Sequence, residues 1–162
     1  MVTHPIDPVF DNRSKILILG SFPSVKSRET DFFYGHPQNR FWKVLSAVLN
    51  SPEPISVEEK RQFLLDHRIA LWDVIASCEI TSSADSSIKN ASANDLTPIF
   101  TAADIRRVYL NGKTAQRYFD RLLSRSRAVK AICLPSTSPA NAAWSLTRLT
   151  ESWAIIRQDL NE

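Results

Sequence analysis

The segment from Phe32 to Trp42 gathers the side chains that are most able to do chemistry, in the order Phe-Phe-Tyr-Gly-His-Pro-Gln-Asn-Arg-Phe-Trp. Its Asn39 has two N–H donors and one acceptor oxygen, and it cannot take up a proton outright. It can therefore position a reacting group and stabilise developing charge, but it cannot act as a general base. Asn39 can equally cap a helix that begins near Arg40, and the two roles are compatible.

The remaining titratable side chains give weaker signals. A single histidine beside a proline is more often a structural hydrogen-bonding partner than a general acid, and we expect this of His36. His4 and His67 show no partner pattern. Asp31, in the aromatic segment, and Asp73, at a plausible strand end, are carboxylates that could activate water. The sequence leaves open whether either of them does so.

The composition of the chain excludes several classes of disulfide-bonded and metal-binding protein. The 162 residues suit one domain spanning residues 1–162. Cys78 and Cys133 are the only cysteines, which excludes a disulfide framework, a zinc finger and a four-cysteine iron–sulfur site. No His/Cys/Asp cluster has the spacing of metal ligands, and neither GxGxxG nor GxxxxGK[ST] occurs. We therefore expect no metal and no cofactor.

Charge and hydropathy bear on partners and location. Twenty Lys and Arg against seventeen Asp and Glu give a net charge of +3, an excess that permits nucleic-acid binding without proving it. No apolar run has the length of a membrane span, and residues 1–8 lack the apolar core of a signal peptide. We expect a cytoplasmic monomer that does not associate with membranes.

Strand and helix patterns alternate along the chain. Short apolar runs predict strands, and spacing and capping signals predict helices. Residues 1–13 are expected to be a polar lead-in and residues 77–95 a long loop. The alternation predicts an α/β fold, a three-layer α/β/α sandwich with a mostly parallel central sheet of about four strands. The expected strands are 15–19, 105–110, 129–134 and 69–75, the last of which could also be a buried turn. The expected helices are 41–49, 56–67, 113–123 and a last one that ends near 159.

Parallel sheets bind ligands at the carboxyl ends of their strands, where the loops 20–39, 77–95 and 135–141 should converge. Together with the aromatic segment, two of these loops resemble the uracil-DNA glycosylase superfamily. They are Gly20-Ser21-Phe22-Pro23-Ser24 and Leu134-Pro135-Ser136-Thr137-Ser138-Pro139-Ala140-Asn141. The aromatic segment is similar to that of the mismatch-specific branch. The combination looks most like the hypoxanthine-DNA (deoxyinosine) glycosylase branch, from about Lys15 to Trp153.

The resemblance implies a base-excision repair enzyme without a metal or cofactor. Such an enzyme would flip a deaminated base, most plausibly hypoxanthine, out of DNA and hydrolyse its N-glycosidic bond. The mismatch-specific branch keeps a catalytic Asn directly before the first loop's Pro, and here that position is Phe22. In the hypoxanthine branch the Asn of the aromatic segment takes over, which makes Asn39 the expected catalytic residue.

The resemblance also implies roles for other positions. Tyr34 stands where the family stacks an aromatic ring on the flipped base, although Phe33 or Phe22 could stack instead. The tip of the last loop would enter the duplex, but it has no bulky apolar side chain, and the sequence does not say what fills the gap. The expected base-binding residues are Ser21, Phe22, Pro23, Tyr34, Gly35 and His36. The expected DNA-binding residues are Arg40, Lys43, Ser136, Thr137, Ser138, Pro139 and Asn141.

Other functions stay open at this point. The same fold could act on uracil or thymine in mismatches, or on xanthine. Because Phe22 replaces the first-loop Asn, the chain could also bind lesions without cleaving them. A nucleotide-binding α/β protein unrelated to DNA is a third and weaker alternative. The preferred mispair, the preference for single or double strands and the oligomeric state are not determined by the sequence.

Overall fold

A four-stranded parallel sheet forms the centre of the protein. The structure is a computed structural model and describes residues 1–81, 87–123 and 131–161. Every neighbouring pair in the sheet is parallel, in the order β3-β2-β6-β7. This confirms the predicted sheet. Its strands are β2 (Ile16–Gly20), β3 (Ile69–Asp73), β6 (Arg107–Asn111) and β7 (Ala131–Leu134).

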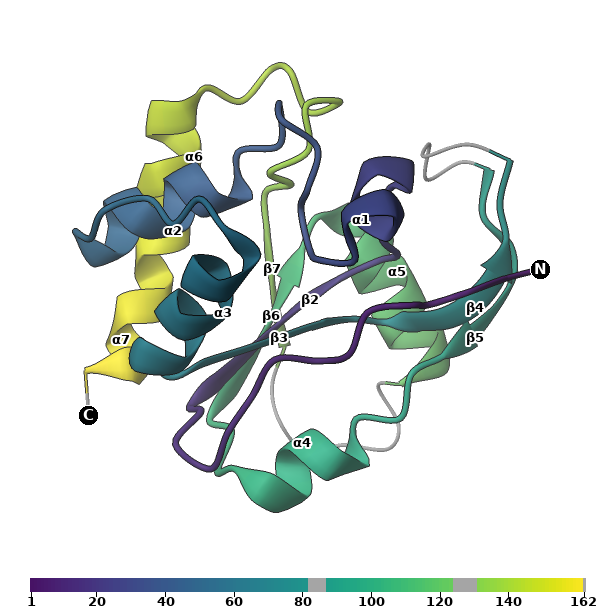
Figure 1. Ribbon diagram of the computed structural model, residues 1–162, viewed down its shortest axis with the longest axis horizontal. Coiled ribbons are helices and arrows are strands. Elements are labelled where there is room, and N and C mark those ends of the chain that lie inside the picture. The colour runs from purple at the N-terminus through teal and green to yellow at the C-terminus, as the bar shows by residue number, and fades with distance from the viewer. Residues whose placement is uncertain (82–86, 124–130, 162) are drawn as a thin grey trace.

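Helices cover both faces of this sheet and complete the predicted three layers (Figure 1). Successive residues of β2 point to opposite faces, so Ile16 and Ile18 join one core while Leu17 and Leu19 join the other. On one face lie α2 (Phe41–Leu49), α3 (Val57–Asp66), α6 (Leu146–Trp153) and α7 (Arg157–Leu160). On the other lie α4 (Thr97–Ala102) and α5 (Lys113–Leu122).

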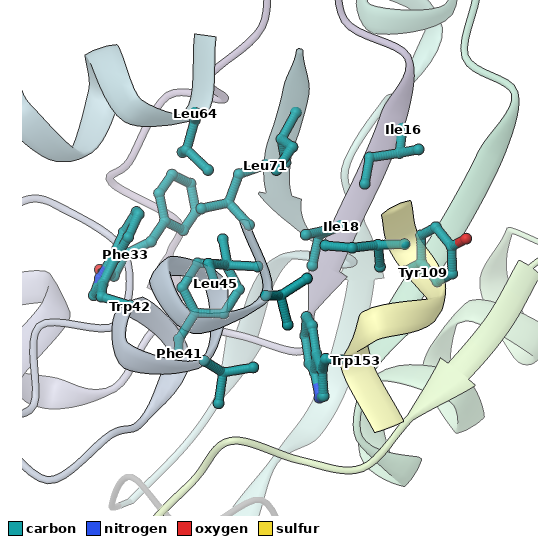
Figure 2. Packing of buried hydrophobic residues seen from close by; sticks show 14 of the residues in the cluster. Ile16, Ile18, Phe33, Phe41, Trp42, Leu45, Leu64, Leu71, Tyr109 and Trp153 are labelled. Atoms are coloured by element: carbon teal, nitrogen blue, oxygen red, sulfur yellow. The ribbon is translucent and has the colours of Figure 1, made fainter. Parts of the chain in front are cut away.

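The first of these cores anchors the segment that carries Asn39. Phe41, at the start of α2, is fully buried and packs edge-to-face on Trp153, with ring centroids 5.9 Å apart. Figure 2 shows both rings beside Leu45 and Ile18. The amino end of α2 is therefore held against the sheet by aromatic packing, which fixes the position of the residue that precedes it.

A second, antiparallel sheet corrects two predictions. Residues 77–95 are not one loop, because β4 (Ile75–Glu79) and β5 (Lys89–Ala93) pair there. Residues 1–13 are not a polar lead-in, because β1 (Val2–Thr3) pairs with β4, and Ile6 and Val9 are buried. β5 is rich in Asn, Ser and Lys and is held by main-chain pairing, which residue types do not reveal.

Two helices also differ from expectation. The short α1 (Val25–Thr30) lies within the predicted loop 20–39. Its N-cap is Ser24, whose side chain accepts from Ser27 N–H. The last helix begins only after Ser145, which caps it, and it is interrupted by a 3-10 turn at Ala154–Ile156. The last strand is described from Ala131 onward, and predicted positions 129–130 lie outside the described residues.

The helix expected from residue 56 has the predicted capping box. The Ser56 hydroxyl accepts from Glu59 N–H at 3.0 Å, and the Glu59 carboxylate accepts from Ser56 N–H at 3.0 Å. The hydrogen bond from the Ser56 backbone lowers the pKa of Glu59. We expect Ser56→Ala to lower the free energy of unfolding by about 0.5–2 kcal/mol in urea denaturation. The control Ser46→Ala, within α2, should change stability little, and equal losses in both variants would contradict the cap assignment.

Candidate active site

A cavity of about 360 Å³ opens at the carboxyl edge of the parallel sheet. Such a volume lies within the usual range for small-molecule sites. Three of the lining residues end strands of the sheet: Gly20 on β2, Asp73 on β3 and Asn111 on β6. The others come from the first loop, the aromatic segment and the last loop: Ser21, Phe22, Pro23, Ser24, Ser27, Phe33, Tyr34, His36, Asn39, Ser136, Thr137, Ser138, Pro139 and Ala140.

Of the three loops that the sequence predicted to converge here, two line the cavity. The loops 20–39 and 135–141 both line it, as expected from their positions after β2 and β7. The segment 77–95 contributes no lining residue among those that the structure describes. Its strands β4 and β5 form the separate antiparallel sheet. In its place, the strand-end residues Asp73 and Asn111 complete the wall.

Asn39 is held in one orientation by two donors on its side-chain oxygen. The Oδ1 atom accepts from the Phe41 backbone N–H at 3.0 Å and from the Thr137 hydroxyl at 2.9 Å. A backbone N–H can only donate, so the atom that faces it must be the amide oxygen. The Nδ2 group makes no hydrogen bond among the described residues. Asn39 thus accepts a hydrogen bond at the start of α2, in agreement with the predicted capping role. Its N–H donors remain available to a ligand in the cavity.

Thr137 is buried, whereas the predicted contact with DNA would require an exposed side chain. It is 0% exposed, so its hydroxyl cannot reach a phosphate in this structure. The hydroxyl instead donates to Asn39 and accepts from Asn111 Nδ2 at 3.0 Å, and Thr137 N–H donates to Asn111 Oδ1 at 3.1 Å. Thr137 is therefore a residue that positions Asn39.

Tyr34 connects to the same hydrogen-bond network. Its hydroxyl accepts from Asn111 Nδ2 at 3.1 Å, and its ring stacks on Phe41 with centroids 4.0 Å apart. Burial, and then the negative charge of Asp73, raise the pKa of Tyr34. The phenol therefore stays protonated near neutral pH and cannot serve as a base. Its position in the cavity wall is compatible with the expected stacking on a base.

The first loop lies as the expected base-binding role requires. Ser21, Phe22 and Pro23 all line the cavity. The ring of Phe22 meets His4 edge-to-face at 5.8 Å, and the Arg28 guanidinium lies 5.8 Å from its centroid. Phe22, directly before the Pro of the first loop, is therefore part of an aromatic wall.

Gly35 and His36 differ in their relation to the cavity. His36 lines it, and its Nδ1 accepts from Gln38 N–H at 3.1 Å, in line with the structural role expected for it. Gly35 is absent from the lining, and its N–H donates to the Ser27 hydroxyl at 2.9 Å. Gly35 therefore shapes the turn of the aromatic segment, and a contact of Gly35 with a base stays a prediction.

Arg40 holds the last loop in place. Its guanidinium donates to the carbonyl oxygens of Ser138 (3.0 Å), Asn141 (3.1 Å) and Trp144. These contacts direct the charge toward the protein backbone, away from the surface position that its expected phosphate contact needs. Lys43 is exposed on α2 and does not line the cavity, so a DNA contact for it stays a prediction.

The last loop is shaped by its own hydroxyl and amide groups. The Ser136 hydroxyl accepts from Ser138 N–H, the Ser138 hydroxyl accepts from Ala140 N–H, and Asn141 Nδ2 donates to the Ser136 carbonyl. Pro139 and Ala140 are exposed at the mouth of the cavity. The loop thus presents small side chains where DNA would approach, and contacts of Ser136, Ser138, Pro139 and Asn141 with DNA stay predictions.

The sequence left open whether Asp31 or Asp73 activates water, and the structure places only one of them at the cavity. Asp31 is exposed at the carboxyl end of α1 and does not line the cavity. Asp73 is buried in the cavity wall and bonds His4 at 2.8 Å. His4 and His67 show no partner pattern in the sequence, but both have partners in the structure, since His67 contacts the Ser51 hydroxyl and the Phe63 carbonyl.

Sequence reasoning missed Asn111 and His4 as parts of the site. Asn111 was assigned to a turn with Gly112, although its position at the end of a predicted strand was a usable signal. His4 had no such signal, because its approach to Asp73 depends on the pairing of β1 with β4.

The bond from Thr137 to Asn39 gives a direct prediction. Thr137→Val keeps the shape of the side chain but removes one of the two donors to Asn39 Oδ1, so that only Phe41 N–H still orients the amide. For the base excision that the resemblance implies, we expect the rate to fall by about 10-fold, the value of one neutral hydrogen bond. Thr137→Ser keeps the hydroxyl and should retain most of the activity. Equal rates for the valine and serine variants in a single-turnover assay would contradict this role.

Comparisons with known proteins agree with this geometry. The model of the family described as the Uracil DNA glycosylase superfamily matches residues 8–160. A protein named hypoxanthine DNA glycosylase from Methanosarcina acetivorans is 33% identical over 97% of this chain and 99% of its own length. Another of that name, from Methanosarcina barkeri, is 32% identical over 91% of this chain and 92% of its own.

A solved structure is similar as well. The solution NMR structure of a Methanosarcina acetivorans protein, described as a candidate uracil DNA glycosylase, has a TM-score of 0.84 at 31% identity and covers both chains fully. Across the described ranges 1–81, 87–123 and 131–161, no helix has the length and apolar character needed to cross a membrane, and no cluster of three or more His, Cys, Asp or Glu could hold a metal.

Proposed function

The chain belongs to the uracil-DNA glycosylase superfamily, and we propose that it removes hypoxanthine from DNA by hydrolysing the bond between the base and the deoxyribose. Two relatives that match nearly the whole chain are named hypoxanthine DNA glycosylase. The enzyme acts on DNA that contains a deaminated base and works as a cytoplasmic monomer. No step of the proposed reaction requires a metal or a cofactor.

The reaction exchanges one bond to the sugar for another. The bond between C1′ and N9 of the base breaks, its electron pair leaves with the base, and water oxygen bonds to C1′. The water loses one proton and the departing hypoxanthine gains one, so the products are free base and an abasic site. The sugar has oxocarbenium character in the transition state, as in glycoside hydrolysis. The protein must therefore stabilise negative charge on the base.

The orientation of Asn39 carries this proposal. Its oxygen is occupied by Phe41 N–H and the Thr137 hydroxyl, so its remaining function is to donate from Nδ2. Donors that are already in place stabilise developing anionic charge without reorganisation. The amino end of α2 follows directly, and the positive end of its helix dipole favours negative charge nearby. Since an amide supplies no proton, we expect slow catalysis.

Tyr34 and the first loop provide the binding part of the site. Base–aromatic stacking is worth about 1–3 kcal/mol, which offsets much of the free energy spent on unstacking a base from the duplex. Ser21, Phe22 and Pro23 face the same cavity and are proposed to contact the base. Ser136, Ser138 and Pro139 border its mouth and are proposed to contact the DNA backbone.

A panel of lesions tests this function. Duplexes containing inosine, uracil or xanthine are incubated with the enzyme, and abasic sites are revealed as strand breaks after alkali. We expect the highest rate on the inosine duplex. Preferential cleavage of the uracil or xanthine duplex would assign the chain to another substrate of the same fold. Tight binding to lesions without any abasic product would make the chain a lesion-binding protein.

A further inference from the structure

A buried histidine–aspartate pair, of which Asp73 lines the cavity, has no role in the proposed bond cleavage. His4 Nε2 and Asp73 Oδ2 lie 2.8 Å apart, and their side chains are 2% and 5% exposed. The pair joins the two sheets, since His4 directly follows β1 and Asp73 ends β3. The imidazole is packed among Phe22, Phe33 and Trp72, with ring centroids 5.8–6.1 Å away.

The protonation of this pair follows from its neighbours. His4 Nδ1 accepts the Ile6 backbone N–H at 3.2 Å, so that ring nitrogen carries no proton. The proton of the neutral imidazole is then on Nε2, which donates to Asp73 Oδ2. The contact is therefore a hydrogen bond in which His4 Nε2–H donates and Asp73 Oδ2 accepts. Asp73 is consequently held as an acceptor.

The second oxygen of Asp73 faces the cavity. Asp73 is a lining residue, and its Oδ1 accepts no hydrogen bond from any described residue. A Cβ built on Gly20 would lie 2.5 Å from Asp73 Oδ1 and 2.8 Å from the Tyr34 hydroxyl. Both oxygens therefore pack so closely on Gly20 that position 20 has no room for a side chain. Because Asp73 lines the cavity, this oxygen of Asp73 can accept from a ligand that supplies an N–H.

We propose that Asp73 is a specificity-determining residue that accepts the ring N–H next to the carbonyl of the flipped base, and that His4 is a positioning residue that holds Asp73 for this contact. The proposal rests on the proposed function, because it names how that cavity selects its base. In this proposal Asp73 recognises the base, whereas Asn39 stabilises the base as it leaves the sugar.

The chemistry of the bases explains why such an acceptor is useful. Deamination converts the N1 of adenine from an acceptor into an N–H donor and places a carbonyl beside it. A carboxylate at this edge accepts from N1–H of hypoxanthine but faces the lone pair of adenine N1. A site that is built to bond an N–H rejects an analogue without it strongly, because its own polar group is left unpaired. Asp73 therefore favours the deaminated base over adenine.

The test uses two substrates that differ at this one atom. Matched duplexes contain deoxyinosine or 1-methyldeoxyinosine, in which a methyl group replaces the N1 hydrogen. The methyl group also prevents normal pairing, so slow excision of this lesion cannot be blamed on base flipping. We expect the wild-type enzyme to prefer deoxyinosine by at least about 100-fold in kcat/KM.

Asp73→Ala should reduce this preference to within about 5-fold, because it removes the acceptor and opens space for the methyl group. Asp73→Asn, which keeps the volume, provides a second variant if the alanine variant is unstable. It should lower excision of deoxyinosine by about 10-fold or more. An unchanged preference in Asp73→Ala would overturn the proposal.

His4 is tested through its partner. His4→Ala should lower the preference for deoxyinosine, and His4→Gln, whose amide can donate to Asp73, should restore part of it. In the Asp73→Ala background, His4→Ala should change the preference by less than about 2-fold, because it acts only through Asp73. His67→Ala, another hydrogen-bonded histidine away from the cavity, is the matched control and should leave the preference unchanged.

These outcomes separate the inference from the function that it refines. If the wild-type enzyme excises no base from the lesion panel, the proposed function fails. If it excises deoxyinosine but also accepts 1-methyldeoxyinosine equally well, the proposed function stands and the role of Asp73 is refuted. An independent effect of His4→Ala in the Asp73→Ala background would refute its positioning role alone.

Discussion

Replacing Asn39 by alanine is expected to lower the single-turnover rate of hypoxanthine excision by about 100- to 1,000-fold, the effect of removing one preorganised donor from a developing anion. Asn39 is the one residue of the cavity whose oxygen is fixed by two donors while its N–H groups stay uncommitted among the described residues. Binding of the inosine duplex should change far less, because the stacking surface of Tyr34 is untouched.

Asn39→Ser separates catalysis from structure. A serine hydroxyl can also accept from the N–H two residues later, so it preserves the turn that begins α2. We expect the serine variant to unfold at nearly the same urea concentration as the wild-type protein and to be as inactive as the alanine variant. If Asn39→Ser keeps most of the activity, the amide serves only the fold and the catalytic assignment is wrong.

Gly20→Ala should nearly abolish excision, with a loss of about 100-fold or more, because its methyl group would occupy the floor of the cavity. The Cβ would meet Asp73 Oδ1 at 2.5 Å and the Tyr34 hydroxyl at 2.8 Å. Asp73 is the register partner of Gly20 and is tied to His4, so it cannot move away freely. A displacement of about 1 Å in such a site reduces rates by about 100-fold.

The same substitution strains the core and should lower the free energy of unfolding by about 1–3 kcal/mol. Ala103→Leu, which overpacks the core at the end of α4 and does not touch the cavity, controls for this loss. Activity is measured well below the thermal transition of each variant. If both variants lose activity in proportion to stability, Gly20 has no special place in the site.

The central sheet could be predicted because its strands are short apolar runs between helices. Ile16 to Leu19 are all fully buried between two parallel neighbours, which is why the pattern there is continuous and not alternating. The capping box at Ser56 was equally local, since both of its hydrogen bonds join residues three apart.

The antiparallel sheet could not be predicted in the same way. β5 reads Lys-Asn-Ala-Ser-Ala, a composition typical of loops, and it is a strand because β4 supplies its main-chain partners. β1 has only two residues. Its effect on the site is large, because it brings His4 to Asp73 across 69 positions of sequence, and nothing local in the sequence encodes that contact.

The candidate site was predictable where a motif names its residues. Asn39, Tyr34 and the first loop line one cavity, as the resemblance implied. Thr137 and Arg40 were expected to meet DNA, because surface loops with hydroxyl and basic groups usually do. Instead they bond within the protein, Thr137 to Asn39 and Arg40 to three loop carbonyls. Such partners depend on tertiary packing that residue types do not specify.

The most direct measurement follows the atoms of the reaction. The wild-type protein is incubated with an inosine-containing duplex in water enriched in oxygen-18, and mass spectrometry quantifies the products. We predict one free hypoxanthine for each abasic site, with the heavy oxygen on the sugar. Unchanged deoxyinosine after prolonged incubation with an excess of folded protein would contradict the account.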